Sequence, residues 1–139
     1  MLVKPVLILF CLLELSNAAA LYFAPGTRYA NAVGVFRAWE QSKQYPEIHD
    51  LVRYLVYWVA GAKLIFLLLL AVIVIFGDVE IQRLSLAALA LGTASFFWRL
   101  YPLIRKMDRG GQIEPENYSK VLGLMILVFI AAFILAALV

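Results

Sequence analysis

Four polar residues lie inside long apolar segments of this sequence, and they are the residues whose types could support chemistry. They are Glu14 and Asn17 in the first segment, Lys63 in the second and Arg99 in the third. A carboxylate that meets an ammonium group in apolar surroundings can form an ion pair that fixes helix packing, or it can form part of a proton or substrate site. A third possibility is that these side chains snorkel to the membrane surface.

The spacing of Glu14 and Lys63 gives them a similar depth. At 1.5 Å per helical residue, Glu14 lies about 15 Å and Lys63 about 18 Å from the end of its segment that adjoins the connection between the two. An ionisable group at mid-membrane costs roughly 2.5 to 3.5 kcal/mol, so it usually has a partner, a cavity or a pathway. We therefore predict an intramembrane polar site that contains Glu14, Asn17, Lys63 and Arg99.

Arg99 is expected nearer the membrane surface than the other three, close to the level of aromatic residues in the second segment. An arginine beside aromatic rings and an amide could bind an anionic head group, and it could equally snorkel to the interface. The further residues that could contact a head group or ligand are Arg53, Tyr54, Tyr57, Trp58 and Ser95.

Catalytic, metal and nucleotide motifs are absent from the sequence. One cysteine, Cys11, excludes an intramolecular disulfide and a CxxC motif, and one histidine, His49, makes a histidine metal site or a haem pair unexpected. No HExxH motif and no glycine-rich phosphate loop occurs. We therefore assign no catalytic residue, no metal and no cofactor. Since the basic residues border apolar segments, the net charge of +3 does not indicate a nucleic-acid partner.

The composition predicts an integral membrane protein. Hydrophobic residues make up 65% of the 139 positions, whereas about 45 to 50% is usual for soluble domains. Four apolar segments are each long enough to cross a bilayer, which takes about 20 residues. We predict one all-α domain, residues 1–139, in which four transmembrane helices form a single bundle. The expected spans are residues 2–24, 50–76, 80–104 and 119–139.

The first segment has some features of a secretory signal: a lysine, an apolar core and then small residues. Glu14 interrupts that core, and the apolar run continues through Leu21 and Phe23 beyond the small residues. We therefore expect this segment to be a retained first helix.

The connection between the first two spans predicts a short amphipathic helix. Residues 29–41 place Ala32, Val33, Phe36 and Trp39 at helical spacing, among charged residues. Such a helix would lie in the membrane interface with its aromatic side chains at headgroup depth.

Small residues follow one face of the third span and end at Arg99. They are Ser85, Ala88, Gly92 and Ser95. Small residues allow helix backbones to approach closely in lipid, so this face predicts a helix-packing seam, with a ligand groove as the alternative. The fourth span has no charge between residues 121 and 139, so it faces lipid or packs on another subunit.

The basic residues predict the orientation. Eight of them border the first and third loops, namely Arg28, Arg37, Lys43, Arg53, Arg105, Lys106, Arg109 and Lys120. The opposite side has only Lys4 and Arg83. The positive-inside rule then places loops one and three in the cytoplasm and both termini outside or in a lumen.

Three local features resemble the small four-helix membrane scaffold proteins of ergosterol biosynthesis. They are Asn17 late in the first span, Arg53 followed five residues later by Trp58, and the Ala-Leu-Gly step at residues 90–92. The resemblance implies a non-catalytic tether that holds membrane enzymes together.

Three functions are therefore considered. The first is a non-catalytic accessory or scaffold subunit, which contacts membrane lipids and either other membrane subunits or a second copy through helix four or the small-residue face of helix three. The alternative is a protein that binds or transports a small molecule, such as a lipid, quinone or anion, at Glu14, Lys63 and Arg99. A proton-coupled carrier would need a dimer to enclose its path.

Overall fold

The computed structural model describes residues 2–139, which form helices joined by turns and two longer loops. The elements in order are α1 (Val3–Phe23), η1 (Val33–Val35), α2 (Arg37–Ser42), α3 (Pro46–Phe76), α4 (Val79–Ala94), η2 (Ser95–Phe97), α5 (Leu100–Arg109) and α6 (Tyr118–Leu138). Within residues 2–139 no strand forms, and one isolated antiparallel bridge joins Phe36 and Ile113. The prediction of an all-α protein is confirmed.

Three helices are long and apolar enough to cross a membrane by length and composition. These are α1, α3 and α6, and α4 with α5 makes a fourth if the bent pair counts as one span. Their apolar side chains are largely on the outside, since buried residues are a minority of each candidate span. The fold is thus compatible with a membrane protein that has several spans.

The third predicted span is broken, contrary to the expectation of one helix over residues 80–104. α4 ends at Ala94, the chain passes through η2, and α5 continues at an angle of 41°. Pro102 explains the break, because it lacks an N–H for the carbonyl of Trp98 and its ring clashes with that carbonyl in a straight helix.

The amphipathic helix expected over residues 29–41 is also shorter than predicted. Ala30 and Asn31 have positive φ angles of 56° and 54°, which a right-handed helix does not allow. The chain therefore turns back after α1, and only η1 and the six-residue α2 are helical in this connection.

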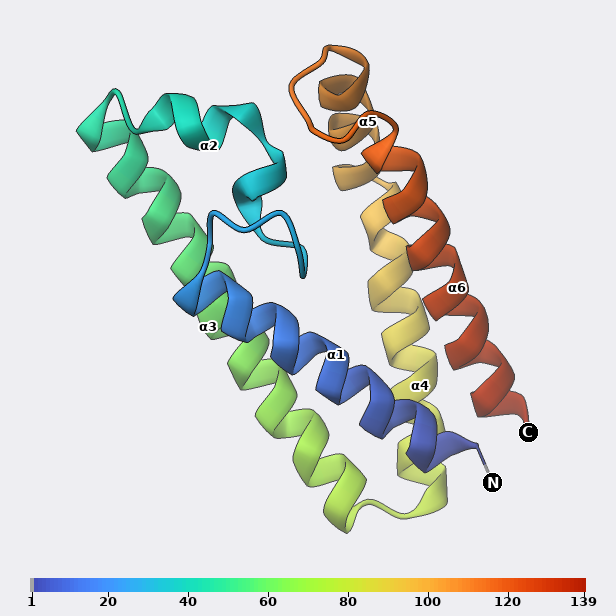
Figure 1. The fold of residues 1–139 in the computed structure, drawn as a ribbon. Coiled ribbons are helices and arrows are strands. Elements are labelled where there is room, and N and C mark those ends of the chain that lie inside the picture. The colour runs from blue at the N-terminus through green and yellow to red at the C-terminus, as the bar shows by residue number, and fades with distance from the viewer. Residues whose placement is uncertain (1) are drawn as a thin grey trace.

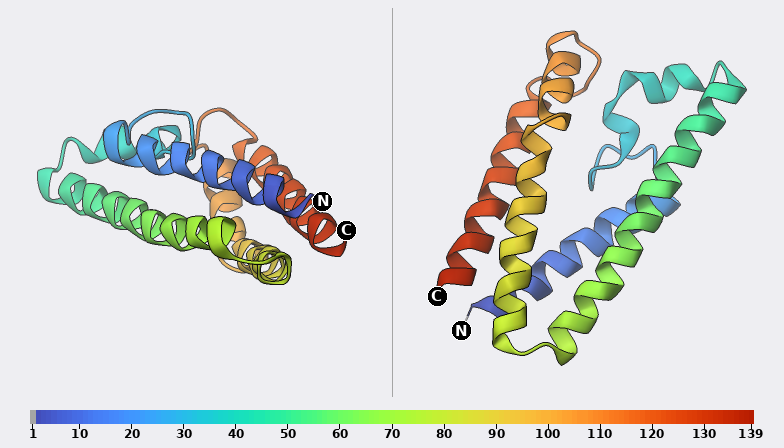
Figure 2. Two further views of the ribbon diagram at one scale, coloured as in Figure 1. Left: turned by 90° about the horizontal axis from the view of Figure 1, so that it is seen from below. Right: turned by 180° about the vertical axis from the view of Figure 1, so that it is seen from behind.

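The helices form two pairs that diverge from one end of the molecule. α1 packs along α3, and α4 packs along α6 (Figure 1). The pairs converge where both chain ends and the α3–α4 turn lie, and they separate toward the loops at the other end (Figure 2). This arrangement leaves space between the pairs rather than a closed four-helix bundle.

Three hydrophobic clusters hold this shape. The largest joins all four long helices at the converging end and includes Leu7, Leu70, Leu86 and Phe133. A second joins α1, α3 and the connection between them, residues 24–45, which we call loop one. A third joins loop one to α5 and to loop three, residues 110–117, through Val35, Ile104 and Ile113. The pairs are therefore joined at both ends, with a gap between the two points of contact.

The turn between α3 and α4 is held by two polar side chains. Asp78 accepts a hydrogen bond from the amide of Ile81 at 2.8 Å and so caps α4. The buried Gln82 amide donates to the carbonyl of Gly77 at 3.0 Å and to that of Val74 at 3.3 Å. These bonds satisfy carbonyls that the end of α3 leaves free, and they fix the converging end.

Candidate functional site

Glu14 of α1 and Lys63 of α3 form an ion pair across the first helix pair. The Lys63 ammonium donates to Glu14 Oε2, and the Asn17 amide donates to Glu14 Oε1 at 3.1 Å. The side chains of Glu14 and Lys63 are 15% and 27% exposed, so the pair is partly covered by protein. Three of the four residues predicted for the intramembrane polar site, Glu14, Asn17 and Lys63, therefore lie together.

Lys63 keeps hydrogen-bonding capacity that the protein does not use. An ammonium group has three N–H donors, and Glu14 is its only hydrogen-bond partner within residues 2–139. Both carboxylate oxygens of Glu14 already accept one bond each. Two donors of Lys63 are thus available to another molecule.

The ion pair forms part of the wall of a cavity between the two helix pairs, which we call the central cavity. Its volume is about 490 Å³, and every long helix and loop one contribute to its lining. Its polar lining residues are Glu14, Lys63, Asn31, Thr93, Ser95 and Tyr118. The size falls in the range of about 300 to 1,000 Å³ that is typical of small-molecule sites.

The remaining wall of the central cavity is apolar and includes four phenylalanines. Phe10 lies at its border with the hydrophobic core, and its ring centroid is 5.9 Å from that of Phe129. Phe36 and Phe96 line it nearer the loops. A few polar groups in an otherwise apolar cavity suit a molecule with one polar part and one apolar part.

Loop one covers the cavity at the end where the helix pairs diverge, and contacts with loop three hold loop one in that position. Asn31, Ala32 and Phe36 of loop one line the cavity. The amide of Arg37 donates to the carbonyl of Gln112 at 2.9 Å, and backbone pairing continues from there into loop three.

Side chains reinforce this contact between the loops. The Glu114 carboxylate accepts hydrogen bonds at 3.0 Å from both Arg28 and Arg37 of loop one. We call these ion pairs and the backbone pairing of loops one and three the clasp.

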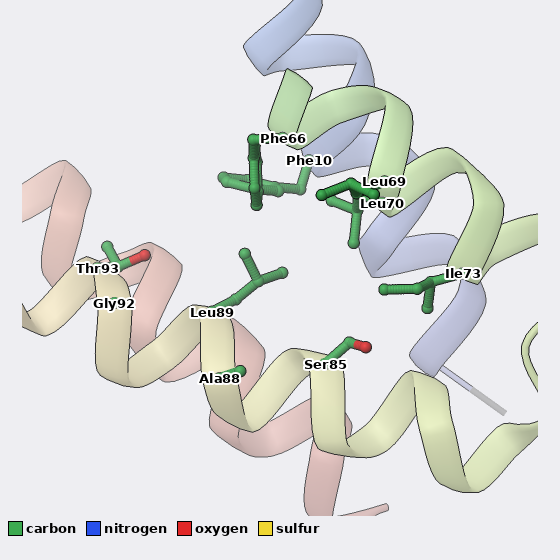
Figure 3. Close-up of a pocket in the computed structure, with 10 residues that line it drawn as sticks. All are labelled: Phe10, Phe66, Leu69, Leu70, Ile73, Ser85, Ala88, Leu89, Gly92 and Thr93. Carbon is green, nitrogen blue, oxygen red and sulfur yellow. The ribbon is translucent and has the colours of Figure 1, made fainter. Parts of the chain in front are cut away.

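An apolar groove leads away from the central cavity toward the α3–α4 turn. It lies between α3 and α4, has a volume of about 480 Å³, and shares Phe10, Gly92 and Thr93 with the central cavity. Figure 3 shows Phe66 and Leu69 of α3 facing Leu89 of α4 across it. The groove and the cavity therefore adjoin each other at the three residues that they share.

The small-residue face of α4 lines this groove instead of forming a packing seam. Ser85, Ala88 and Gly92 all line the groove, and a Cβ placed on Gly92 would meet no atom within 4 Å. α4 instead packs on α6 with a different face, through Leu86 and Ala90. Within residues 2–139 the expected seam is thus an open surface.

The other residues predicted for the site lie elsewhere. Arg99 is exposed, with its guanidinium carbon 5.9 Å from the Trp98 ring centroid, and it does not line the central cavity. Tyr54 and Trp58 are exposed. Arg53 donates to the Tyr57 hydroxyl at 3.4 Å.

Tyr57 and Ser95 complete the set of predicted contacts. The ring of Tyr57 stacks on Tyr22 of α1, so it contributes to the packing of α1 on α3 and does not line the cavity. Ser95 does line the cavity, and its hydroxyl donates to the Gly92 carbonyl at 2.6 Å.

Three polar residues of the site were not predicted from the sequence: Asn31, Thr93 and Tyr118, the last at the start of α6. Asn31 reaches the cavity because loop one turns back after α1, and Thr93 reaches it because α4 presents its small-residue face there. No group of three or more His, Cys, Asp or Glu side chains suited to a metal occurs in the described residues.

Comparison with known proteins adds no assignment. No family model, no curated protein and no solved structure matches this chain. The function proposed below therefore rests on the geometry of the central cavity and on the composition of the helices.

Proposed function

We propose that this protein is a multi-pass membrane protein that binds an amphiphilic small molecule in its central cavity. The observation that carries the proposal is the position of Lys63, which lines the cavity and has two donors without a partner in residues 2–139. A donor at the wall of an apolar cavity is most stable when a ligand or water accepts its hydrogen bonds.

The depth of the ion pair supports this proposal. At 1.5 Å per residue, Lys63 lies about 20 Å from Phe76 at the end of α3, and Glu14 lies about 16 Å from Val3 at the start of α1. Both distances are near half the bilayer hydrocarbon thickness of about 30 Å. Ionisable groups at that depth usually mark a ligand or ion site.

The proposed orientation follows the basic residues. The clasp, α2 and the polar end of α5 are at the basic side, and the turn at Gly77 and Asp78 is at the other. The positive-inside rule then places the clasp in the cytoplasm and both chain ends outside or in a lumen. In this orientation loop one covers the central cavity on its cytoplasmic side.

The accessory-subunit hypothesis is the competing function. It predicts that membrane lipids and partner subunits, or a second copy, cover the apolar faces of α6 and α4. Exposed leucines such as Leu91, Leu124 and Leu135 are equally suited to lipid, so exposure does not favour a partner. The ion pair beside the cavity is the feature that favours binding of a small molecule.

The deciding experiment is gentle detergent extraction from the native membrane, followed by mass spectrometry of co-purifying lipids, small molecules and protein chains. The Gly92→Phe variant places a ring in the open space of the cavity, and Leu91→Phe adds the same ring on the outer face of α4, where Leu91 is 76% exposed. Thermal melts of both variants show whether each is folded.

We expect one class of amphiphile to be retained by the wild type and by Leu91→Phe, and to be depleted at least about tenfold in Gly92→Phe, which corresponds to about 1.4 kcal/mol. Stoichiometric partner chains without a retained small molecule would contradict the proposal and support the accessory subunit. Equal retention by the two folded variants would contradict binding in the central cavity.

A further inference from the structure

We infer that the molecule in the central cavity is an amphiphile with an uncharged hydrogen-bonding head and one long apolar tail, the tail lying in the groove between α3 and α4. This inference rests on the proposed function and specifies its ligand. The geometry assigns the head to the region of Lys63 and Thr93 and the tail to the groove lined by Phe66, Leu69 and Ile73.

The charge of the polar end selects an uncharged head. Glu14 neutralises Lys63 in the ion pair, and among the residues that line the central cavity no other side chain is charged. A carboxylate head would compete with Glu14 for Lys63 and leave one anion without its partner. An ammonium head would compete with Lys63 for Glu14 and leave one cation without its partner. Uncompensated charge in apolar surroundings is strongly unfavourable.

The hydrogen-bonding groups define what that head must offer. Lys63 has two free N–H donors, and the side chains of Asn31, Thr93 and Tyr118 line the cavity without a hydrogen bond to any residue in 2–139. A hydroxyl, ester or ketone oxygen accepts from such donors. A glycerol ester, a long-chain alcohol and a ketone-bearing ring have this chemistry in common.

The groove defines the tail. It begins at Gly92, where there is no side chain, and continues past Ala88 toward Ile73 and Ser85. The Ser85 hydroxyl is bonded to the Ile81 carbonyl at 2.8 Å, so the groove offers no free hydroxyl at that end. A chain that starts beside Lys63 can therefore run in apolar contact toward the α3–α4 turn.

Head chemistry is the property to vary in a test. Because a lipid tail is as apolar as the leucines of the groove, moving it from bilayer to groove provides little driving force. Selectivity then comes from the hydrogen bonds and charge at the head and from the shape of the groove. Probes that share one tail and differ only in the head report on the inference directly.

The experiment uses the full chain in phosphatidylcholine nanodiscs and three photoreactive probes. Each probe has the same saturated acyl or alkyl tail with a diazirine at its far end, and the heads are a glycerol ester, a carboxylate and a primary ammonium. Labelled peptides are identified by mass spectrometry. Ala88→Phe blocks the groove, and Ala87→Phe is the matched control, because Ala87 is exposed on the same outer face of α4 as Leu91 and does not line the groove.

The glycerol-ester probe should label the groove segments 66–73 and 85–92, with at least about tenfold less labelling in Ala88→Phe than in Ala87→Phe, equivalent to about 1.4 kcal/mol. The two charged probes should label the groove about tenfold less than the uncharged one. In Glu14→Gln, where Lys63 loses its counter-charge, the carboxylate probe should become the preferred one. If Glu14→Gln does not fold, the comparison of Ala88→Phe with Ala87→Phe still tests whether the tail lies in the groove.

Two other outcomes would overturn the inference while leaving the proposed function in place. Preferential groove labelling by a charged probe would show that the site exists and that its ligand has a charged head. Labelling of the central cavity without the groove would show that the tail lies elsewhere. If every probe labels the cavity and the groove no more strongly than it labels the outer face of α4, both this inference and the proposed function fail.

Discussion

Glu14 and Lys63 contact each other across α1 and α3 at the wall of the central cavity, although 49 positions separate them in the sequence. The contact joins the two helices of the first pair near the middle of their lengths. Asn17 orients Glu14 from one turn further along α1. The pair therefore contributes both to helix packing and to the polar part of the cavity.

Neutralising one member of the pair should destabilise the protein more than replacing both. Glu14→Gln or Lys63→Met alone leaves an uncompensated charge and should cost about 3 to 5 kcal/mol, whereas the double variant should be close to wild type. Reversible unfolding in detergent gives the four free energies of a double-mutant cycle. Additive effects would contradict the contact, because residues that touch show coupling energy.

The clasp should contribute to order in loop one more than to global stability. The side chains of Arg28, Arg37 and Glu114 are 63%, 57% and 40% exposed, and exposed ion pairs contribute at most about 1 kcal/mol. Glu114→Gln should therefore lower the melting temperature only slightly. Hydrogen exchange at the amide of Arg37, which bonds to loop three, should become several-fold faster, as expected for local opening.

Glu40→Gln is the control for the clasp, because among residues 2–139 Glu40 pairs only with Lys43, which lies in the same loop. It should leave exchange at the Arg37 amide unchanged. Equal exchange in Glu114→Gln and wild type would show that the backbone pairing alone holds the two loops together.

Gly123 should be intolerant of a side chain because α5 approaches α6 closely there. A Cβ at Gly123 would lie 2.7 Å from Cε2 of Tyr101. Gly123→Val should cost about 1 to 3 kcal/mol of unfolding free energy, as overpacking usually does. Adding Tyr101→Ala should recover part of that loss, and thermal denaturation of the single and double variants measures it. A neutral Gly123→Val would contradict the close approach.

The orientation can be tested with a membrane-impermeant thiol reagent. In a Cys11→Ala background, a cysteine at Gln112 in the clasp region should stay unlabelled in sealed, right-side-out cells, because the eight-to-two distribution of basic residues predicts a cytoplasmic loop three. A cysteine at Asp78 in the opposite turn should be labelled. The reverse pattern would overturn the proposed orientation.

Much of the helical architecture could be predicted from the sequence, because apolar length and turn residues carry that information. The segments that became α1, α3 and α6 are long and apolar, and Gly77 and Asp78 mark the turn before α4. The similar depth of Glu14 and Lys63 could be anticipated from helical rise, whereas their contact also requires that α1 and α3 be neighbours and present these faces to each other.

The rest depends on features that spacing does not encode. Pro102 breaks the third span, so the helical register that placed Arg99 on the small-residue face no longer applies beyond Ala94. Asn31 enters the cavity only because Ala30 and Asn31 adopt left-handed backbone angles. Glycine is the usual sequence marker of such angles, and neither position is a glycine. The divergence of the helix pairs is a tertiary property, and it decides that Gly92 faces open space.

The most direct test of the central claim is a crystal structure of the natively extracted protein grown in a lipidic mesophase. We expect two separate helix pairs and continuous electron density in the central cavity, with a polar atom about 2.7 to 3.2 Å from Lys63 Nζ and an apolar tail passing Gly92 toward Ile73. A structure in which α3 packs against α4 along its length and closes the cavity would contradict the central claim.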